Sequence, residues 1–273
     1  MFDFNKAIAE ASKASESPLV GAIILGSSGA GKSSLIGTAG VKTLYLYTSG
    51  EDHGVKAAKA IAGSDIVPLC LDHADDKKLT ADETYERLLS ILASHDQLKS
   101  LGVGLVAVDG ASELEAIIRG TKAWATSCLS ASGKHNAFAE PTATVSMFRP
   151  ILNGLKDLQR KIGCHFVVTC ILDVKSLGIN GEIEEASPRL LGYSVAESLV
   201  QQFGDVLVVG KMAKDGVVKY KLQFLTDIVK TSKDDKGNLK RSMNFAPRVS
   251  GHQNLPAYLP ADLKEVIKLK GTK

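Results

Sequence analysis

The segment from Gly26 to Ser33 constrains the possible fold more than any other part of the sequence. It reads GSSGAGKS, follows an apolar run from Val20 to Leu25, and precedes a helical pattern from Ser34 to Thr38. A strand, a glycine-rich turn and a helix in this order let successive backbone N–H groups point into one hollow at the helix N-terminus. This context makes the GxxxxGK[ST] pattern typical of a phosphate-binding loop in an α/β fold.

The residue types within the loop indicate how a nucleotide would be held. In such loops the lysine reaches the β and γ phosphates, and the hydroxyl group after it ligates magnesium. Here these residues are Lys32 and Ser33. We therefore expect ATP and Mg²⁺ as cofactors, and the predicted binding residues are Gly26, Ser27, Ser28, Gly29, Ala30, Gly31, Lys32, Ser33 and Ser34.

Acidic residues at the ends of two other apolar runs complete the predicted site. The run Leu105 to Val108 ends in Asp109, which we predict as the second magnesium ligand. Hydrolysis also needs a carboxylate that orients or deprotonates the attacking water. The candidates are Glu51, after the second run, and Glu113 or Glu115, after Asp109.

The distribution of apolar residues predicts a mainly parallel sheet flanked by helices. Apolar runs alternate with helical patterns, and a capping box of Thr80 and Glu83 opens one of the helices. Pro150 is expected to start or kink another helix. From residue 203 the pattern changes to antiparallel hairpins with turns at 215–216 and 234–238, followed by a final helix after Asp262. The five runs are 19–25, 43–47, 66–71, 103–108 and 164–171.

Composition is consistent with this architecture and limits the setting. With 273 residues, 44% of them apolar and 23% charged, the chain is long enough for one α/β domain over 18–273, preceded by a helix or arm over 1–17. The four cysteines form no CxxC pair, and we expect buried thiols in a reducing, cytoplasmic setting. The sequence has no secretion leader and no run long enough to span a membrane, and its net charge of +3 is too small to indicate a partner.

The order of these features resembles the RecA/RadA class of ATPases. The segment Thr43 to Glu51 is similar to the RadA-type strand that delivers a catalytic glutamate, and Asp109 is followed by Gly110 rather than by the acidic residue of other additional-strand ATPases. The resemblance implies that Glu51 is the base, with Asp52 and His53 as lesser candidates.

The later segments extend the resemblance to core-only RecA-like proteins of bacteriophages, which are ATPases that anneal single strands. It covers most of residues 19 to 270, although only the phosphate loop is highly specific. The matching segments are 187–192, 203–208, Arg248 and 259–263.

This likeness implies a RecA-like core, ATP hydrolysis, and a homo-oligomer or filament with ATP at the subunit interface. A phage-encoded chain would work in the bacterial host cytoplasm and could have a single-strand binding protein as partner. Arg248, Lys211 or Lys214 would complete the site from a neighbouring subunit. Thr169 stands near the usual polar sensor and is expected to contact the γ phosphate, whereas Cys170 cannot replace a sensor amide.

Single-stranded DNA is the partner that the resemblance implies, held by loops at about 120–144 and 173–193. The first contains Lys122, Trp124, Lys134 and His135, which suit base stacking and phosphate contacts but also a partner-binding or mobile loop. The second carries Glu182, Glu184 and Glu185, which would repel a phosphate backbone.

Three classes of function therefore remain open. The first is an ATPase that acts on single-stranded DNA in recombination or annealing. The second is an ATP-controlled assembly or interaction protein that does not bind DNA, and the third is a metabolite kinase, for which a lid of clustered arginines is missing. Nine Lys or Arg residues against five Asp over 205–243 fit a solvated hairpin face or a nucleic-acid groove.

Overall fold

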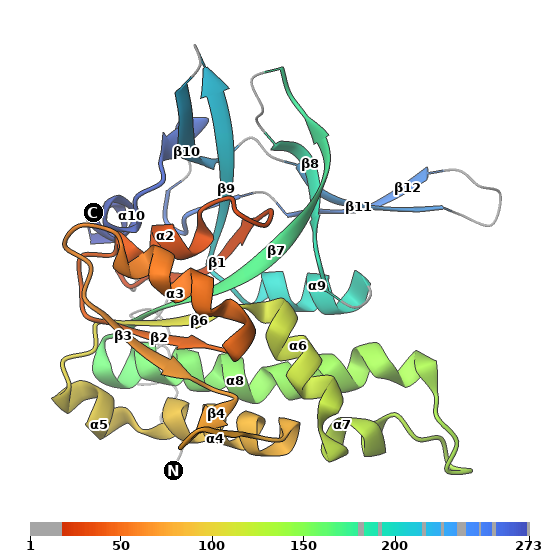
Figure 1. Ribbon diagram of the computed structural model, residues 1–273. Coiled ribbons are helices and arrows are strands. Elements are labelled where there is room, and N and C mark those ends of the chain that lie inside the picture. The colour runs from red at the N-terminus through yellow and green to blue at the C-terminus, as the bar shows by residue number, and fades with distance from the viewer. Residues whose placement is uncertain are drawn as a thin grey trace, which may run out of the picture.

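The computed structural model confirms an α/β architecture built on a mostly parallel sheet (Figure 1). The structure describes residues 18–179, 183–190, 193–214, 217–224, 227–233, 239–245, 247–252 and 255–271. The predicted arm over 1–17 and the turns at 215–216 and 234–238 lie outside the described residues. Within the described ranges, no helix combines the length and apolar character needed to cross a bilayer.

Six parallel strands form the centre of the sheet. Their order places β7 between β1, which leads into the glycine-rich loop Gly26–Ser33, and β6, which ends in Asp109. In order across the sheet the strands are β3 (Ile66–Cys70), β2 (Thr43–Tyr47), β6 (Leu105–Asp109), β7 (His165–Leu177), β1 (Gly21–Gly26) and β9 (Asp205–Lys214). All five predicted runs are strands, so the rhythm of the sequence predicted this core.

Both faces of the central sheet are covered. On β1, Ile23 and Leu25 belong to one core cluster, whereas Ala22 and Ile24 belong to a second. The first cluster packs under α4 (Ala81–Ala93), α5 (His95–Ser100), α6 (Ala111–Gly120), α7 (Lys122–Ser127), α8 (Glu140–Ile162) and α9 (Tyr193–Gln201). The second packs under α2 (Lys32–Gly37), α3 (Asp52–Lys59) and α10 (Leu263–Gly271).

Antiparallel strands extend the sheet, as the hairpin pattern predicted. β10 (Val217–Gln223) pairs with β9, and β13 (Tyr258–Pro260) pairs with β10. The distal half of β7 pairs antiparallel with β8 (Ile183–Pro188). β8 in turn pairs in parallel with β11 (Asp227–Lys233), which is antiparallel to β12 (Leu239–Phe245). The predicted loop over 173–193 is therefore largely a β-hairpin, because β7 continues well past the run that the sequence marked.

Two helices refine the expectations for the connecting segments. Thr80 caps α4 in the predicted capping box with Glu83. Pro150 does not start its helix, because α8 begins ten residues earlier, at Glu140. Pro150 lies inside α8 on an exposed position, where the carbonyl that loses its helical hydrogen bond can be hydrated. The predicted loop over 120–144 is shortened by α7 and by a 3₁₀ turn, η2 (Ala137–Ala139).

Candidate functional site

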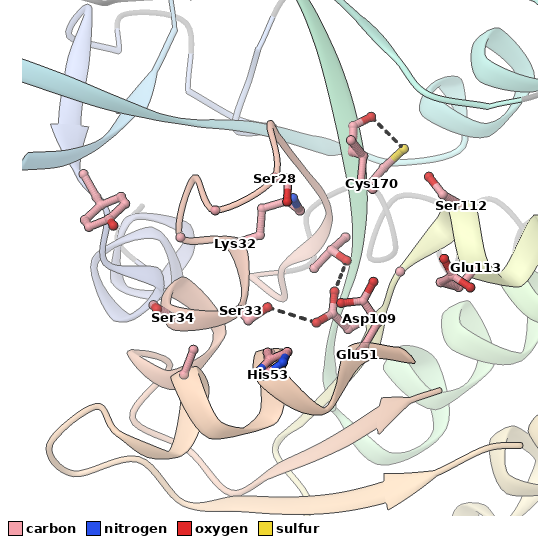
Figure 2. Close-up of a pocket in the computed structure, with 18 residues that line it drawn as sticks. Ser28, Lys32, Ser33, Ser34, Glu51, His53, Asp109, Ser112, Glu113 and Cys170 are labelled. Atoms are coloured by element: carbon pink, nitrogen blue, oxygen red, sulfur yellow. Dashed lines mark hydrogen bonds between the residues drawn. The ribbon is translucent and has the colours of Figure 1, made fainter. Parts of the chain in front are cut away.

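A pocket of about 460 Å³ lies where the central strands end and α2 begins. The carboxyl ends of parallel strands meet at this edge, which is where α/β proteins commonly bind ligands. Figure 2 shows Lys32 and Ser33 facing Asp109 and Glu51 across it. Those four residues, predicted from separate parts of the sequence, therefore line one cavity of a size suited to a small-molecule ligand.

Glycine conformations shape the loop between β1 and α2. Gly29 and Gly31 have φ values of 69° and 92°, a left-handed region that L side chains rarely adopt. Gly31 is the N-cap of α2, so the first helical N–H groups point into the pocket without intrahelical partners. The loop residues that line the pocket are Ser28, Gly29, Gly31, Lys32, Ser33 and Ser34, whereas Gly26, Ser27 and Ala30 do not line it.

Lys32 is held against the loop that it would serve. Its Nζ donates to the carbonyl oxygens of Gly26 at 3.0 Å and Ser27 at 3.1 Å. Burial lowers the pKa of Lys32, while the nearby carboxylates of Asp109 and Glu51 act against that shift. An anion in the pocket would stabilise the charged ammonium group.

Asp109 is the centre of a network of hydroxyl groups. Ser33 Oγ donates to its Oδ2 at 3.0 Å, Tyr45 Oη donates to the same oxygen, and Thr169 Oγ1 donates to Oδ1. None of these donors carries a positive charge. Asp109 thus lies buried with its negative charge balanced by no bonded cation among the described residues.

The space beside Asp109 is kept open by Gly54 of α3. A Cβ atom at this position would lie 2.7 Å from Asp109 Oδ2 and 2.9 Å from Ser33 Oγ. Oxygen ligands from a hydroxyl and a carboxylate, with room for water, are what Mg²⁺ requires. The residues present therefore fit a magnesium ion held by Ser33 and Asp109.

Glu51 lies in the pocket at the end of a 3₁₀ turn, η1 (Ser49–Glu51), that follows β2. Burial raises the pKa of its carboxyl group, and the charges of Asp109 and Glu113 raise it further. A raised pKa makes the carboxylate a stronger base. Glu113 and His53 also line the pocket, whereas Asp52 is exposed outside it and Glu115 is buried elsewhere.

Thr169 and Cys170 reach the pocket from β7, the strand on which the resemblance places a polar sensor. The hydroxyl group of Thr169 is bonded to Asp109, so Thr169 orients the carboxylate. Cys170 is buried, and burial raises the pKa of its thiol to about 12. A thiol that stays protonated lines the cavity as a small, weakly polar wall.

The β9–β10 hairpin covers the loop from the same chain. Tyr220 lines the pocket, and a Cβ atom at Gly31 would lie 2.9 Å from its ring. Lys211 Nζ lies 3.7 Å from the Cβ position of Gly29 and over the Tyr220 ring. The sequence had suggested Lys211 for the site of a neighbouring subunit, but the structure places it beside its own phosphate loop.

Arg248 lies at the opposite edge of the sheet. It pairs with Val206 at the beginning of β9, and its guanidinium donates to the carbonyl oxygens of Phe203 and Gly204. It does not line this pocket. Its predicted role is therefore excluded within one chain and stays a prediction only for a neighbouring subunit.

Trp124 is not available as a stacking surface for a nucleotide base. Its ring is buried, Nε1 donates to Thr144 Oγ1 at 2.9 Å, and the Arg119 guanidinium covers the ring. The exposed aromatic residue of the same segment is Phe138, with 95% of its surface accessible. The sequence could not distinguish these rings, because their burial depends on how α7 packs against α8.

Three residues of the site were missed by the sequence reading: Tyr45, Gly54 and Tyr220. A tyrosine within a fully buried parallel strand is itself a hint, because its hydroxyl group needs a partner. The Gly54 and Tyr220 contacts depend on the packing of α3 and the β9–β10 hairpin, which no local pattern encodes.

Comparison with the models of known protein families gives no match, and comparison with curated proteins likewise gives no similar sequence. The site is therefore interpreted from its own geometry.

Proposed function

We propose that this chain is a RecA-like phosphate-loop ATPase that binds Mg²⁺ and ATP and acts on single-stranded DNA in recombination or annealing. The observation that carries the proposal is the convergence of Lys32, Ser33, Asp109 and Glu51 on one pocket at the N-terminus of α2. The strand order also supports it. β7 lies between the loop strand β1 and β6, so Asp109 reaches the pocket from the strand that is second from the loop strand.

Each group has a role that follows from its position. The loop N–H groups and Lys32 would hold the phosphate oxygens, and Ser33 and Asp109 would hold the magnesium ion. When bound, Mg²⁺ would neutralise the negative charge that develops on the phosphates during the reaction. Tyr45 and Thr169 keep Asp109 in place through their hydroxyl groups.

We assign Glu51 as the base that activates the attacking water. As the water oxygen forms its bond to the γ phosphorus, Glu51 accepts the water proton, and the bond to the bridging oxygen breaks so that ADP leaves with its electron pair. Burial beside two other carboxylates raises the pKa of Glu51, which strengthens it as a base.

Two variants test the assignment. Lys32→Ala should abolish tight ATP binding, whereas Glu51→Gln should preserve binding and lower turnover by about 10²- to 10⁴-fold. Glu113→Gln is the matched control, because Glu113 lines the same pocket. If Glu113→Gln stops turnover and Glu51→Gln does not, the roles of the two carboxylates are reversed.

Phe138 supports the DNA part of the proposal. It is almost fully exposed within the segment where the resemblance places DNA, and Lys122 and Lys134 are exposed in the same segment. An aromatic ring with nearby cations suits a single strand, which binds through stacking and phosphate contacts.

Oligonucleotide binding at several salt concentrations, with and without ATP, tests this part. We expect affinity to fall as salt rises, ATP hydrolysis to be stimulated by single strands, and Phe138→Ala to weaken binding. Leu101→Ala removes another exposed apolar residue, after α5, and should change nothing. Indifference of the wild-type chain to DNA would contradict this part while leaving ATP binding intact.

The end of β7 favours the second candidate, an ATP-controlled assembly protein. Leu177 and Ile179 are 59% and 99% exposed there. Aliphatic side chains cannot stack on bases, and exposed apolar groups typically mark protein contacts. Light scattering in the presence of ATP, measured with and without single strands, distinguishes the two candidates. Only the second predicts assembly that requires ATP, is prevented by Leu177→Ser and is unaffected by DNA.

A further inference from the structure

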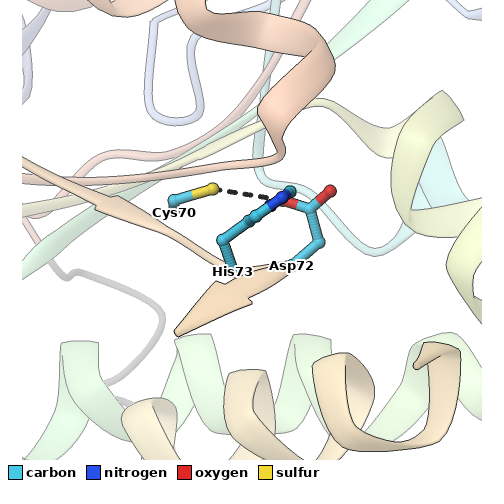
Figure 3. Close-up of side chains that lie close together, drawn as sticks. All are labelled: Cys70, Asp72 and His73. Carbon is cyan, nitrogen blue, oxygen red and sulfur yellow. Dashed lines mark hydrogen bonds and ion pairs between the residues drawn. The ribbon is translucent and has the colours of Figure 1, made fainter. Parts of the chain in front are cut away.

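Three side chains of different chemistry meet where β3 ends, outside the nucleotide pocket. Cys70 is the last residue of β3, and Asp72 and His73 follow it (Figure 3). One possible ligand atom from each lies within 4.8 Å of the others. Cys70 Sγ donates to Asp72 Oδ1 at 3.1 Å, and His73 Nδ1 lies 3.4 Å from the same oxygen.

These separations are close to those that a tetrahedral ion needs. Zinc binds thiolate sulfur at about 2.3 Å and imidazole nitrogen or carboxylate oxygen at about 2.0 to 2.2 Å, which places its ligands roughly 3.3 to 3.8 Å apart. Small side-chain adjustments would therefore bring all three groups onto one ion. Mg²⁺, by contrast, prefers oxygen ligands alone and suits the Ser33 and Asp109 site.

A short hairpin fixes the backbone of the three residues. β4 (His73–Ala74) pairs with β5 (Lys77–Lys78) across a turn in which Asp75 and Asp76 have positive φ. Leu79 N–H donates to the Asp72 carbonyl oxygen at 2.8 Å, and the Arg87 guanidinium donates to the His73 carbonyl oxygen. Binding an ion at a site that is already ordered costs little conformational entropy.

Second-sphere hydrogen bonds orient the carboxylate. Ser49 donates to Asp72 twice, from its backbone N–H at 2.8 Å and from Oγ at 2.7 Å. His73 Nδ1 is shielded from solvent without a hydrogen-bond partner, so this nitrogen has no other bond to give up.

The group is also accessible, unlike the other thiols. Cys128, Cys164 and Cys170 are buried, whereas Cys70 is partly exposed, contrary to the expectation of a buried thiol. The side chains of Asp72 and His73 keep 15% and 37% of their surface accessible. The cluster therefore borders solvent through these side chains.

We infer that Cys70, Asp72 and His73 form a binding site for one zinc-type divalent cation, with water as its fourth ligand. On binding, the Cys70 thiol releases its proton to solvent and a metal–sulfur bond forms. Because Asp72 holds Ser49, two residues before Glu51, an ion here would also fix the turn that carries the proposed base. The site itself does not depend on the proposed nucleotide chemistry.

Metal binding to the full chain, with excess Mg²⁺ and no nucleotide, tests the inference. We expect one Co²⁺ per chain with the intense thiolate charge-transfer absorption, and X-ray absorption of the Zn²⁺ form should show one sulfur ligand at about 2.3 Å. Zn²⁺ at a hundredfold excess over its dissociation constant should raise the Tm by roughly 5 °C or more. A wild-type chain with no cobalt–sulfur absorption overturns the inference whatever the variants do.

Variants locate the site. Cys70→Ser should remove the sulfur absorption, and His73→Ala should weaken Zn²⁺ binding at least about 10-fold, whereas Cys128→Ser and His135→Ala should leave both unchanged. Ser49→Ala should weaken Zn²⁺ affinity about 10-fold because it removes a bond that orients Asp72, while Ser64→Ala should not. Sulfur absorption that persists in a folded Cys70→Ser variant would overturn the assignment. ATP binding is measured separately, so loss of the zinc site and loss of the proposed function are distinguishable.

Discussion

Asp109 and Asp205 are both buried carboxylates on the central sheet, but their charges are balanced in different ways. Asp205 lies at the amino-terminal edge, where Lys270 Nζ pairs with it at 3.2 Å and Gly21 N–H and Ser250 also donate to it. Asp109 lies at the carboxyl edge and accepts only from hydroxyl groups among its described hydrogen bonds. The first arrangement is complete within the chain, whereas the second leaves negative charge available to a cation.

Strand β1 connects the two arrangements. Its first residue, Gly21, is bonded to Asp205, and its last, Gly26, opens the phosphate loop. A closed network at one edge thus holds the strand whose other end forms the open site. We conclude that a buried charge indicates function when its neighbours leave it uncompensated, and structure when they neutralise it.

Exchanging each carboxylate for an amide should separate the two roles and gives the largest effects. Asp205→Asn should cost about 3 kcal/mol in the free energy of unfolding, because it leaves the buried Lys270 charge unpaired. Asp109→Asn should lower Mg²⁺-dependent ATP hydrolysis at least about 100-fold with little loss of stability, since the surrounding hydroxyl groups can rotate to accept hydrogen bonds. Denaturant unfolding and steady-state ATPase assays on both variants measure these effects. Equal losses of stability in the two variants would contradict the proposed difference between Asp109 and Asp205.

Gly54 sharpens the comparison by testing whether the space beside Asp109 is needed. Gly54→Ala should lower ATP hydrolysis about 10-fold or more, because the new Cβ would meet Asp109 Oδ2 and Ser33 Oγ. The fold should tolerate the change, since alanine favours the helix by about 1 kcal/mol. Gly50→Ala is the control, as no atom lies within 4 Å of a Cβ there. Equal activity of the two variants would show that the space has no role.

The pH dependence of kcat/KM tests the electrostatics of the open site. Burial and the charges of Asp109 and Glu113 raise the pKa of Glu51, and a base must be deprotonated to act. As pH falls, kcat/KM should decline through a value above 4.5, the ordinary pKa of a glutamate side chain. Glu113→Gln removes one like charge and should move that limb to lower pH. An acid limb unchanged by Glu113→Gln would contradict this electrostatic account.

The smallest expected effect is on stability. Because folding raises the pKa of Glu51, protonation of this side chain stabilises the folded chain at low pH. That contribution to the free energy of unfolding is lost as the pH rises through the pKa of Glu51 in the folded chain. At neutral pH, Glu51→Gln should therefore raise the Tm of the nucleotide-free chain by roughly 1 to 2 °C. Differential scanning calorimetry would detect this shift, and a lower Tm would show that Glu51 stabilises the fold instead.

Sequence reasoning was most successful where a pattern is local. The strand, glycine-rich turn and helix around Gly26–Ser33, the end of β6 and the capping box at Thr80 each involve residues close together in the chain, and the structure has all three. Prediction was harder where position depends on packing between distant segments. Lys211 lies beside the loop of its own chain and Arg248 at the far edge because of how β9 and β10 join the sheet, which spacing in the sequence does not encode. A role for Arg248 in the site of a neighbouring subunit stays a prediction.

One further difference has the same origin. The resemblance places a loop at 173–193, but β7 continues to Leu177 by pairing with β8. The register of β6 with β7 also places the hydroxyl group of Thr169 on Asp109. The expected contact of Thr169 with the γ phosphate stays a prediction.

The central claim is that the pocket at the N-terminus of α2 binds the phosphates of ATP together with Mg²⁺. Calorimetric titration of the purified chain with ATP, with Mg²⁺ and with a chelator, tests it most directly, using Lys32→Ala as the control. The account predicts saturable binding of one ATP per chain that is strengthened by Mg²⁺ and lost in the variant. Absence of binding heat in the wild-type chain at several temperatures, or unchanged binding by Lys32→Ala, would contradict it.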